Sequence, residues 1–215
     1  MLITTQNIGK KFRNEWIFRK VNFELSSGNS YTFTGANGSG KSTLLQVLAG
    51  FIPANEGVIS YQLPVVSKQL QTNTSYLDPD DFYQHVIIAS PYLELVEEFT
   101  LTELVEFHCQ FKNFRNSLTV TDFINFIQLP QARNKAVKYF SSGMKQRLKL
   151  GLAFCSDCAI MMLDEPTANL DAEASRWYLE NVQIYAQNRL LLIASNQPNE
   201  YEFCENIIKM SDLKV

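Results

Sequence analysis

A glycine-rich stretch with the sequence GANGSGKST has the residue types and the spacing that hold phosphate groups. It lies between an alternating apolar run and a helix-like run, which is the context that this pattern requires. Backbone N–H groups of such a turn, with the N-terminus of the following helix, bind several negative charges without a buried counter-charge for each oxygen. The lysine can then reach the β- and γ-phosphates, and the next serine can ligate Mg²⁺. The stretch predicts a nucleoside triphosphate site formed by Gly35, Ala36, Asn37, Gly38, Ser39, Gly40, Lys41, Ser42 and Thr43.

Two carboxylates follow an apolar run farther along the chain. Residues 158–163 are apolar without alternation, as in a buried parallel strand, and Asp164 and Glu165 come directly after them. Sheets of parallel strands bind ligands at the carboxyl ends of the strands. Asp164 is therefore expected to join Ser42 in holding Mg²⁺, and Glu165 to polarise a water for attack on the γ-phosphate. Glu165 and Lys41 are the predicted catalytic residues.

Length and composition limit what the rest of the chain can be. The 215 residues have a mass of 24.6 kDa, enough to bury a sizeable core, and are most simply one domain over 1–215. The formal net charge is −3 and the charges are scattered, so no nucleic-acid surface is expected. No apolar run is long enough to span a bilayer and the N-terminus has no signal-peptide core, so we expect a cytoplasmic protein.

The order of hydrophobic patterns predicts an α/β protein. We expect a P-loop nucleoside triphosphatase fold with a mostly parallel sheet flanked by helices and an N-terminal antiparallel β part. The period becomes helical from residue 100, and residues 92–140 are predicted to be a helical subdomain inserted in the sheet core. The polar stretch 62–84 is predicted to be mainly surface loop. Strands are expected at 2–5, 16–18, 21–25, 31–33, 58–61, 86–89, 158–163, 190–194 and 207–210.

Three features allow both a functional and a purely structural interpretation. Phe12 is either a core aromatic residue or a stacking plate for an adenine ring, and the sequence does not separate the two. His108 lies on an aromatic helix, where a histidine is more often packed than a ligand or base. Cys155 and Cys158 have the spacing of a metal or redox pair, but no second ligand pair accompanies them, which favours reduced core cysteines.

Four segments together resemble the ATP-binding subunit of an ABC transporter, in order and over essentially the whole chain: GANGSGKST, which corresponds to the Walker A loop, FSSGMKQR, MMLDEPTANLD and LLLIASN. In that family the second segment is the signature, which caps the γ-phosphate of an ATP held by the opposite subunit. The resemblance implies that Ser141 and Gly143 make this contact, and that the active unit is a head-to-tail homodimer holding two ATPs. It also implies that Asp171 forms a contact across the dimer and that Phe12 is the aromatic plate under adenine.

The chain departs from the family pattern at three places. Asn196 occupies the position of the usual histidine at the γ-phosphate, and an amide cannot become charged. The usual glutamine near the start of the helical subdomain is missing from residues 89–92, with Glu94 as a hypothetical substitute. The signature also has Ser142 and Met144 where glycine and glutamine are commoner. ATP binding is expected to persist, and hydrolysis to be slow.

The family resemblance implies an ATPase that dimerises on binding ATP and drives a separately encoded transmembrane permease. The subunit would then lie on the cytoplasmic face of the membrane, held there by that permease. Two alternatives stay open: a soluble ATPase of the same superfamily that is not a transporter, and a nucleotide-binding regulatory module with little hydrolysis. In this family the permease selects the cargo, so the sequence of this chain names none.

Overall fold

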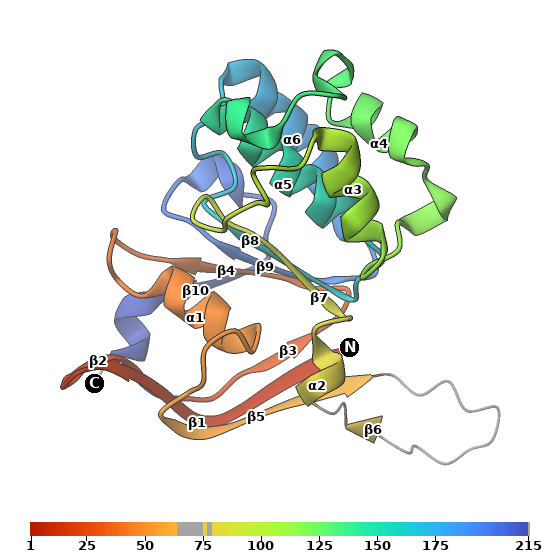
Figure 1. Ribbon diagram of the computed structural model, residues 1–215. Coiled ribbons are helices and arrows are strands. Elements are labelled where there is room, and N and C mark those ends of the chain that lie inside the picture. Colours follow the sequence, from red (N-terminus) through yellow and green to blue (C-terminus); the bar gives the residue numbers. More distant parts are fainter. Residues whose placement is uncertain (64–74, 77–78, 215) are drawn as a thin grey trace.

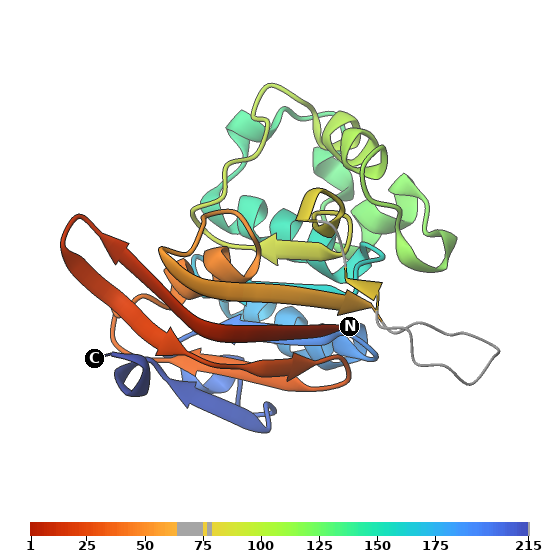
Figure 2. The same ribbon diagram turned by 90° about the horizontal axis from the view of Figure 1, so that it is seen from below.

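The computed structural model describes residues 1–63, 75–76 and 79–214, which form two β-sheets with helices between and above them (Figure 1). Helix α1 (Lys41–Leu48) lies between the two sheets, and the helices within residues 101–186 cover the opposite face of the parallel sheet. Seen from below, the antiparallel sheet spreads across the near side of the molecule (Figure 2). This arrangement is the predicted P-loop fold with an added antiparallel sheet, so the predicted fold class is confirmed.

The antiparallel sheet is built from the N-terminal part of the chain. Its strand order is β2-β1-β5-β6, and β3 also pairs with β1. The prediction of one strand over 21–25 is wrong, because one strand ends at Val21 and the next begins at Glu24. Lys20 has a positive φ of 55° just before this interruption, and within it the Phe23 carbonyl accepts a hydrogen bond from the Thr5 N–H. The strands are β1 (Leu2–Phe12), β2 (Glu15–Val21), β3 (Glu24–Ser26), β5 (Glu56–Leu63) and β6 (Ser75–Tyr76).

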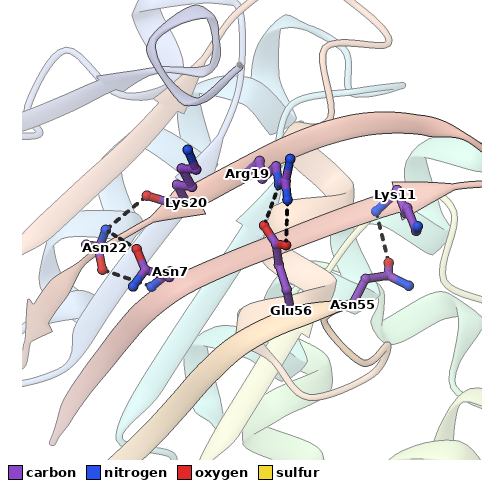
Figure 3. A network of polar contacts seen from close by, with 7 residues as sticks. All are labelled: Asn7, Lys11, Arg19, Lys20, Asn22, Asn55 and Glu56. Carbon is purple, nitrogen blue, oxygen red and sulfur yellow. Dashed lines mark hydrogen bonds and ion pairs between the residues drawn. The ribbon is translucent and has the colours of Figure 1, made fainter.

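Polar side chains pin the long β1–β2 hairpin to its neighbour β5 (Figure 3). Arg19 in β2 donates two hydrogen bonds to the Glu56 carboxylate in β5, from Nε at 2.8 Å and Nη2 at 3.2 Å. The Lys11 backbone N–H donates to the Asn55 side chain at 2.9 Å, close to the tip of the hairpin. These bonds fix the orientation of the hairpin whose first strand ends at Phe12.

The parallel sheet has the strand order β10-β4-β9-β8-β7, and every neighbouring pair is parallel. Strands β8 and β9 are buried along their whole length, which confirms the prediction made from their uninterrupted apolar runs. The pairing places Asp164 beside Ala194 and Phe33 beside Ala194, so the carboxyl ends of three strands meet at one edge. The strands are β4 (Ser30–Thr34), β7 (Val86–Ala89), β8 (Ile160–Asp164), β9 (Leu190–Ala194) and β10 (Asn206–Lys209).

A side chain caps the N-terminus of each of the helices α3, α4, α5 and α6. Thr100 and Glu103 form a capping box at the start of α3, and Thr119 and Asp122 form another at α4. The helices are α2 (Pro79–Phe82), α3 (Leu101–Cys109), α4 (Val120–Phe126), α5 (Ser142–Cys155) and α6 (Ala172–Ala186). Short 3₁₀ turns are η1 (Arg115–Ser117), η2 (Pro130–Ala132), η3 (Val137–Tyr139), η4 (Pro198–Glu200) and η5 (Met210–Leu213). Of the predicted loop at 62–84, residues 64–74 and 77–78 lie outside the described residues.

The buried apolar side chains form one cluster on each face of the parallel sheet. Cys155 and Cys158 belong to the cluster under α5 and α6, and burial raises the pKa of the Cys155 thiol to about 12. His108 packs at the edge of the same cluster, where its Nε2 lies 2.7 Å from Ser156 Oγ and burial lowers its pKa to about 4. These three side chains therefore belong to the packing of the helical side of the molecule.

Candidate nucleotide-binding site

The phosphate loop connects β4 to α1 and adopts a conformation that depends on glycine. Gly40, the residue before α1, has a φ of 102°, and a Cβ there would lie 2.2 Å from Ile17 Cγ2. Lys41, the first residue of α1, is almost fully buried, and its Nζ donates to the Gly35 carbonyl at 2.8 Å and the Ala36 carbonyl at 3.2 Å. The ammonium group therefore lies inside the curve of the loop.

Asp164 forms the polar centre of the site. Its carboxylate is buried at the end of β8 and accepts a hydrogen bond from Ser42 Oγ at 2.9 Å and another from Ser90 Oγ at 3.0 Å. Burial raises the pKa of Asp164, and the two hydroxyl hydrogen bonds act in the opposite direction. Residues that are 122 positions apart in the sequence thus meet at one edge of the sheet, as the strand-end rule predicts for Ser42 and Asp164.

Ser90 was missed by the sequence analysis, although it directly follows the buried strand β7. The same strand-end rule that indicated Asp164 could have found it. The structure gives no support to Glu94 as the substitute for the family's glutamine: Glu94 is exposed, whereas Ser90 is buried against Asp164. The side chain of Lys149 in α5 holds this turn, because its Nζ donates to the Ser90 carbonyl at 3.0 Å and the Pro91 carbonyl at 2.9 Å.

Glu165 follows Asp164 in a strained conformation that turns the chain out of the sheet. Its φ is 43°, a value that few residues other than glycine adopt, and its backbone N–H donates to the Ala194 carbonyl at 2.9 Å. The side chain lines the same cavity as Lys41 and Ser42. The two predicted catalytic residues are therefore brought together.

The cavity encloses about 370 Å³ beside the phosphate loop. Phe12 lies at this cavity with 51% of its surface exposed, which rules out the interpretation of Phe12 as a core residue. Ile17 and Tyr92 also line the cavity, and neither was found from the sequence, because both reach it only through the folding of the hairpin and the turn after β7. The complete lining is Phe12, Ile17, Asn37, Gly38, Gly40, Lys41, Ser42, Thr43, Tyr92 and Glu165.

Asn196 lies beside the phosphate loop, where its Nδ2 donates to Asn37 Oδ1 at 2.9 Å. It lies two residues after the end of β9, so the phosphate loop and the segment after this strand come together although Asn37 and Asn196 are 159 positions apart. Asn196 thus lies beside the loop that is predicted to hold the phosphates, and its own contact with a nucleotide stays a prediction.

The signature residues line a different hollow of about 320 Å³, which shares no residue with the first cavity. Ser141 caps α5 by accepting from the Met144 N–H at 3.2 Å, and Asp171 caps α6 by accepting from the Ala174 N–H at 2.8 Å. A Cβ at Gly143 would lie 2.9 Å from the Asn169 carbonyl oxygen, so the two segments touch. The structure therefore brings Ser141, Gly143 and Asp171 together, away from Lys41 and Glu165.

The fold and the cavity define a P-loop ATPase, and comparison with known proteins defines its family. Residues 18–168 match the family model described as ABC transporter, which is more than half of the chain. The chain belongs to the ABC transporter family and is the ATP-binding, ATP-hydrolysing subunit of such a transporter, which confirms the resemblance in the sequence. In the described ranges 1–63, 75–76 and 79–214, no helix has the length and apolar character needed to cross a membrane.

Individual relatives agree with this family over nearly the whole chain. The "Putative hemin import ATP-binding protein HrtA" of Staphylococcus aureus is 28% identical over 213 residues, which cover 98% of this chain and 95% of that protein. Among solved structures, the ATP-binding cassette MJ0796, a dimer bound to ADP and Pi, has a TM-score of 0.80 at 21% identity and covers 99% of this chain and 96% of its own. An ATP-binding subunit of an ABC transporter has a TM-score of 0.78 at 20% identity over 97% of this chain and 85% of its own.

Proposed function

We propose that this subunit hydrolyses Mg²⁺-ATP in the cavity beside the phosphate loop, as one half of a head-to-tail homodimer that drives a separately encoded membrane permease. The observation that carries this proposal is that Lys41, Ser42 and Glu165 line one cavity, while the buried Asp164 accepts a hydrogen bond from the Ser42 hydroxyl at 2.9 Å. A nucleotide-binding module that did not hydrolyse would have no need for a second carboxylate at this place.

The donor set around Asp164 fits Mg²⁺. Ser42 and Asp164 offer a hydroxyl and a carboxylate oxygen 2.9 Å apart, and hard oxygen ligands of this kind suit Mg²⁺. The carboxylate is buried, and its hydrogen-bond partners among the described residues are two hydroxyl groups, so a cation would offset the unfavourable desolvation of its charge. When bound, Mg²⁺ neutralises charge that develops on the β- and γ-phosphates.

The residues of this chain have distinct roles in the proposed reaction. The N–H groups of the phosphate loop and the Lys41 ammonium hold the phosphates, and Phe12 stacks under the base. Glu165 orients and deprotonates the attacking water, because its carboxylate lines the cavity that would hold the γ-phosphate. Asn196 donates a hydrogen bond at the same end, without the positive charge that a histidine can carry.

The separation of the two hollows supports the dimer. Ser141 and Gly143 lie at the N-terminus of α5, where N–H groups favour an anion, yet their hollow shares no residue with the cavity of Lys41. Two copies arranged head to tail would bring the signature hollow of one over the phosphate loop of the other, and Asp171 to the contact between them. The relative MJ0796 is described as dimeric in its ADP- and Pi-bound structure.

The permease completes the transporter and selects the cargo. The relatives named after hemin import match 98% of this chain, and a tetrapyrrole is therefore the first cargo that a reconstituted permease should be offered. The subunit would work at the cytoplasmic face of the membrane.

The test is phosphate release by the purified subunit with ATP and Mg²⁺, alongside Glu165→Gln. We expect release by the parent, loss of release in the variant, and an ATP-dependent dimer of the variant in size-exclusion chromatography. Replacement of the exposed Glu173 by Gln is the matched control and should leave release unchanged. Equal release by the parent and Glu165→Gln would refute the catalytic assignment.

A further inference from the structure

Glu200 is a fully buried acidic residue that is not among the residues with a role in the proposed reaction. It ends the short turn η4, and its exposed surface is 0%. Burying a carboxyl group is unfavourable unless hydrogen bonds replace the water that it loses. A buried polar network of this kind calls for an explanation beyond packing, because apolar residues of similar volume would fill the same space at a lower desolvation cost.

The two carboxyl oxygens of Glu200 bind two different loops. Oε1 accepts hydrogen bonds from the Thr167 backbone N–H at 2.9 Å and from the Thr167 hydroxyl, and Oε2 accepts from the Ser195 hydroxyl. The backbone carbonyl of Glu200 also accepts from the Tyr178 hydroxyl at 2.9 Å, which ties the turn η4 to α6. The carboxyl group is thus a bridge between the chain after β8 and the chain after β9.

Each bridged residue lies within two positions of a residue that is proposed to act on the nucleotide. Thr167 lies two positions after Glu165, and Ser195 immediately precedes Asn196. Asn196 continues the connection to the phosphate loop through its 2.9 Å bond to Asn37. Glu165 has a φ of 43°, a conformation that persists only where the surroundings hold it. Two backbone hydrogen bonds support it: its N–H donates to the Ala194 carbonyl at 2.9 Å, and its carbonyl accepts from the Ala168 N–H at 3.0 Å.

We infer that Glu200 is a positioning residue, which fixes the loop of Glu165 and the loop of Asn196 relative to one another. It thereby sets the distance between the Glu165 and Asn196 side chains, between which the γ-phosphate would react. This inference rests on the proposed function for the roles of Glu165 and Asn196. Glu200 itself touches neither ATP nor water in the reaction. Its effect is on the distance between two groups, and a small error in such a distance reduces the rate far more than the binding of substrate.

The test compares Glu200→Gln with the parent and with Glu202→Gln, an exposed control two residues away. A glutamine keeps the shape of the side chain, but its NH₂ group cannot accept a hydrogen bond from Thr167 or Ser195. We expect kcat for phosphate release to fall about tenfold to a hundredfold in Glu200→Gln, with KM for ATP changed by less than about threefold. The control should match the parent in both.

Hydrogen exchange with ATP and Mg²⁺ gives a second measurement that needs no turnover. In the parent, the segments 165–170 and 194–198 should gain protection together when ATP binds. In Glu200→Gln only segment 194–198, which contains Asn196 and contacts the phosphate loop, should still gain protection when ATP binds. Joint protection and an unchanged kcat in Glu200→Gln would overturn the inference. Loss of ATP binding in proportion to kcat would also overturn it, because Glu200 would then support the whole site rather than the spacing of two loops.

The inference and the proposed function can fail separately. Unchanged turnover in Glu165→Gln would refute the proposed function, whereas the exchange experiment would still show whether Glu200 couples the two loops. Should Glu200→Gln not fold, Ser195→Ala removes one arm of the bridge and leaves the carboxyl group with Thr167. The same uncoupling is expected there, and its absence would overturn the inference.

Discussion

The Lys149 ammonium in α5 donates a hydrogen bond to the Ser90 carbonyl at 3.0 Å, while the Ser90 hydroxyl donates to the Asp164 carboxylate at 3.0 Å. One residue thus joins the helix that begins at the signature hollow to the carboxylate proposed to hold Mg²⁺. The chain lacks the family's glutamine at this turn. The two contacts of Ser90 instead connect helix α5 to Asp164 in the nucleotide-binding site.

Replacement of Lys149 by methionine should weaken both stability and turnover. The apolar stem of the side chain would be kept, but the carbonyls of Ser90 and Pro91 would lose their donor. We expect the free energy of unfolding to fall by about 1–3 kcal/mol and kcat to fall more than KM rises, because the Asp164 partner would be less well placed. Lys135→Met changes an exposed lysine and should be neutral in both denaturant unfolding and phosphate release. A neutral Lys149→Met would show that the Ser90 turn needs no support.

Replacement of Phe12 by alanine should weaken ATP binding without changing the chemical step. Its ring lies at the cavity and is half exposed, so its loss should cost little stability. Because base stacking on an aromatic side chain is worth roughly 1–3 kcal/mol, we expect KM for ATP to rise about tenfold with kcat nearly unchanged. Phe12→Trp should restore binding, whereas Phe111→Ala, at another exposed ring, should have no effect. An unchanged KM in Phe12→Ala would remove the stacking role.

The features that could be predicted from the sequence are those set by local pattern. The uninterrupted apolar runs of β8 and β9 indicated buried parallel strands, and the rule for strand ends then placed Asp164 near Ser42. The glycine loop indicated its own conformation, because Gly40 requires a positive φ and a close neighbour. In these segments the local sequence pattern determines the conformation, so the pattern alone was sufficient to predict it.

The features that were missed depend on contacts between distant segments. Ser90, Tyr92 and Glu200 are ordinary residues in the sequence, and only the folded chain brings Glu200 to Thr167, 33 positions away. The break between β2 and β3 was missed for a related reason: alternation continues through Val21 and Phe23, while the irregular backbone is fixed by Thr5 on a neighbouring strand. The hydrophobic periodicity and the composition of a segment do not reveal which distant residues it contacts.

Acid should destabilise the protein through His108. Burial is the main cause that lowers the pKa of His108 from 6.5 to about 4, and the nearby Lys112 charge acts in the same direction. The unfolded state therefore binds the proton more readily, so stability contributed by the neutral ring is present above pH 6.5 and is lost as the pH falls toward 4. The loss over this window is about 3 kcal/mol.

The measurement is denaturant unfolding of the parent and His108→Asn between pH 4 and pH 8. The variant should lose some stability at pH 8, where the ring no longer meets Ser156, but its stability should fall less steeply with acid than that of the parent. His85→Asn, which changes the only other histidine, serves as the control and should retain the steep fall. Equal slopes for the parent and His108→Asn would contradict the assignment.

The Asn196 side chain gives a way to test whether the missing histidine limits the rate. Asn196 is exposed at the end of β9 and reaches Asn37 of the phosphate loop at 2.9 Å, so a larger ring can be accommodated on the solvent side. In Asn196→His an imidazole could donate to a γ-phosphate oxygen and carry positive charge as negative charge develops there, which an amide cannot do. We expect kcat to rise about tenfold while KM stays close to that of the parent. Asn199→His places the same ring three residues away on an exposed position and should leave kcat unchanged. A kcat that does not rise in Asn196→His would place the rate limit elsewhere, with the turn of Ser90 as the next group to alter.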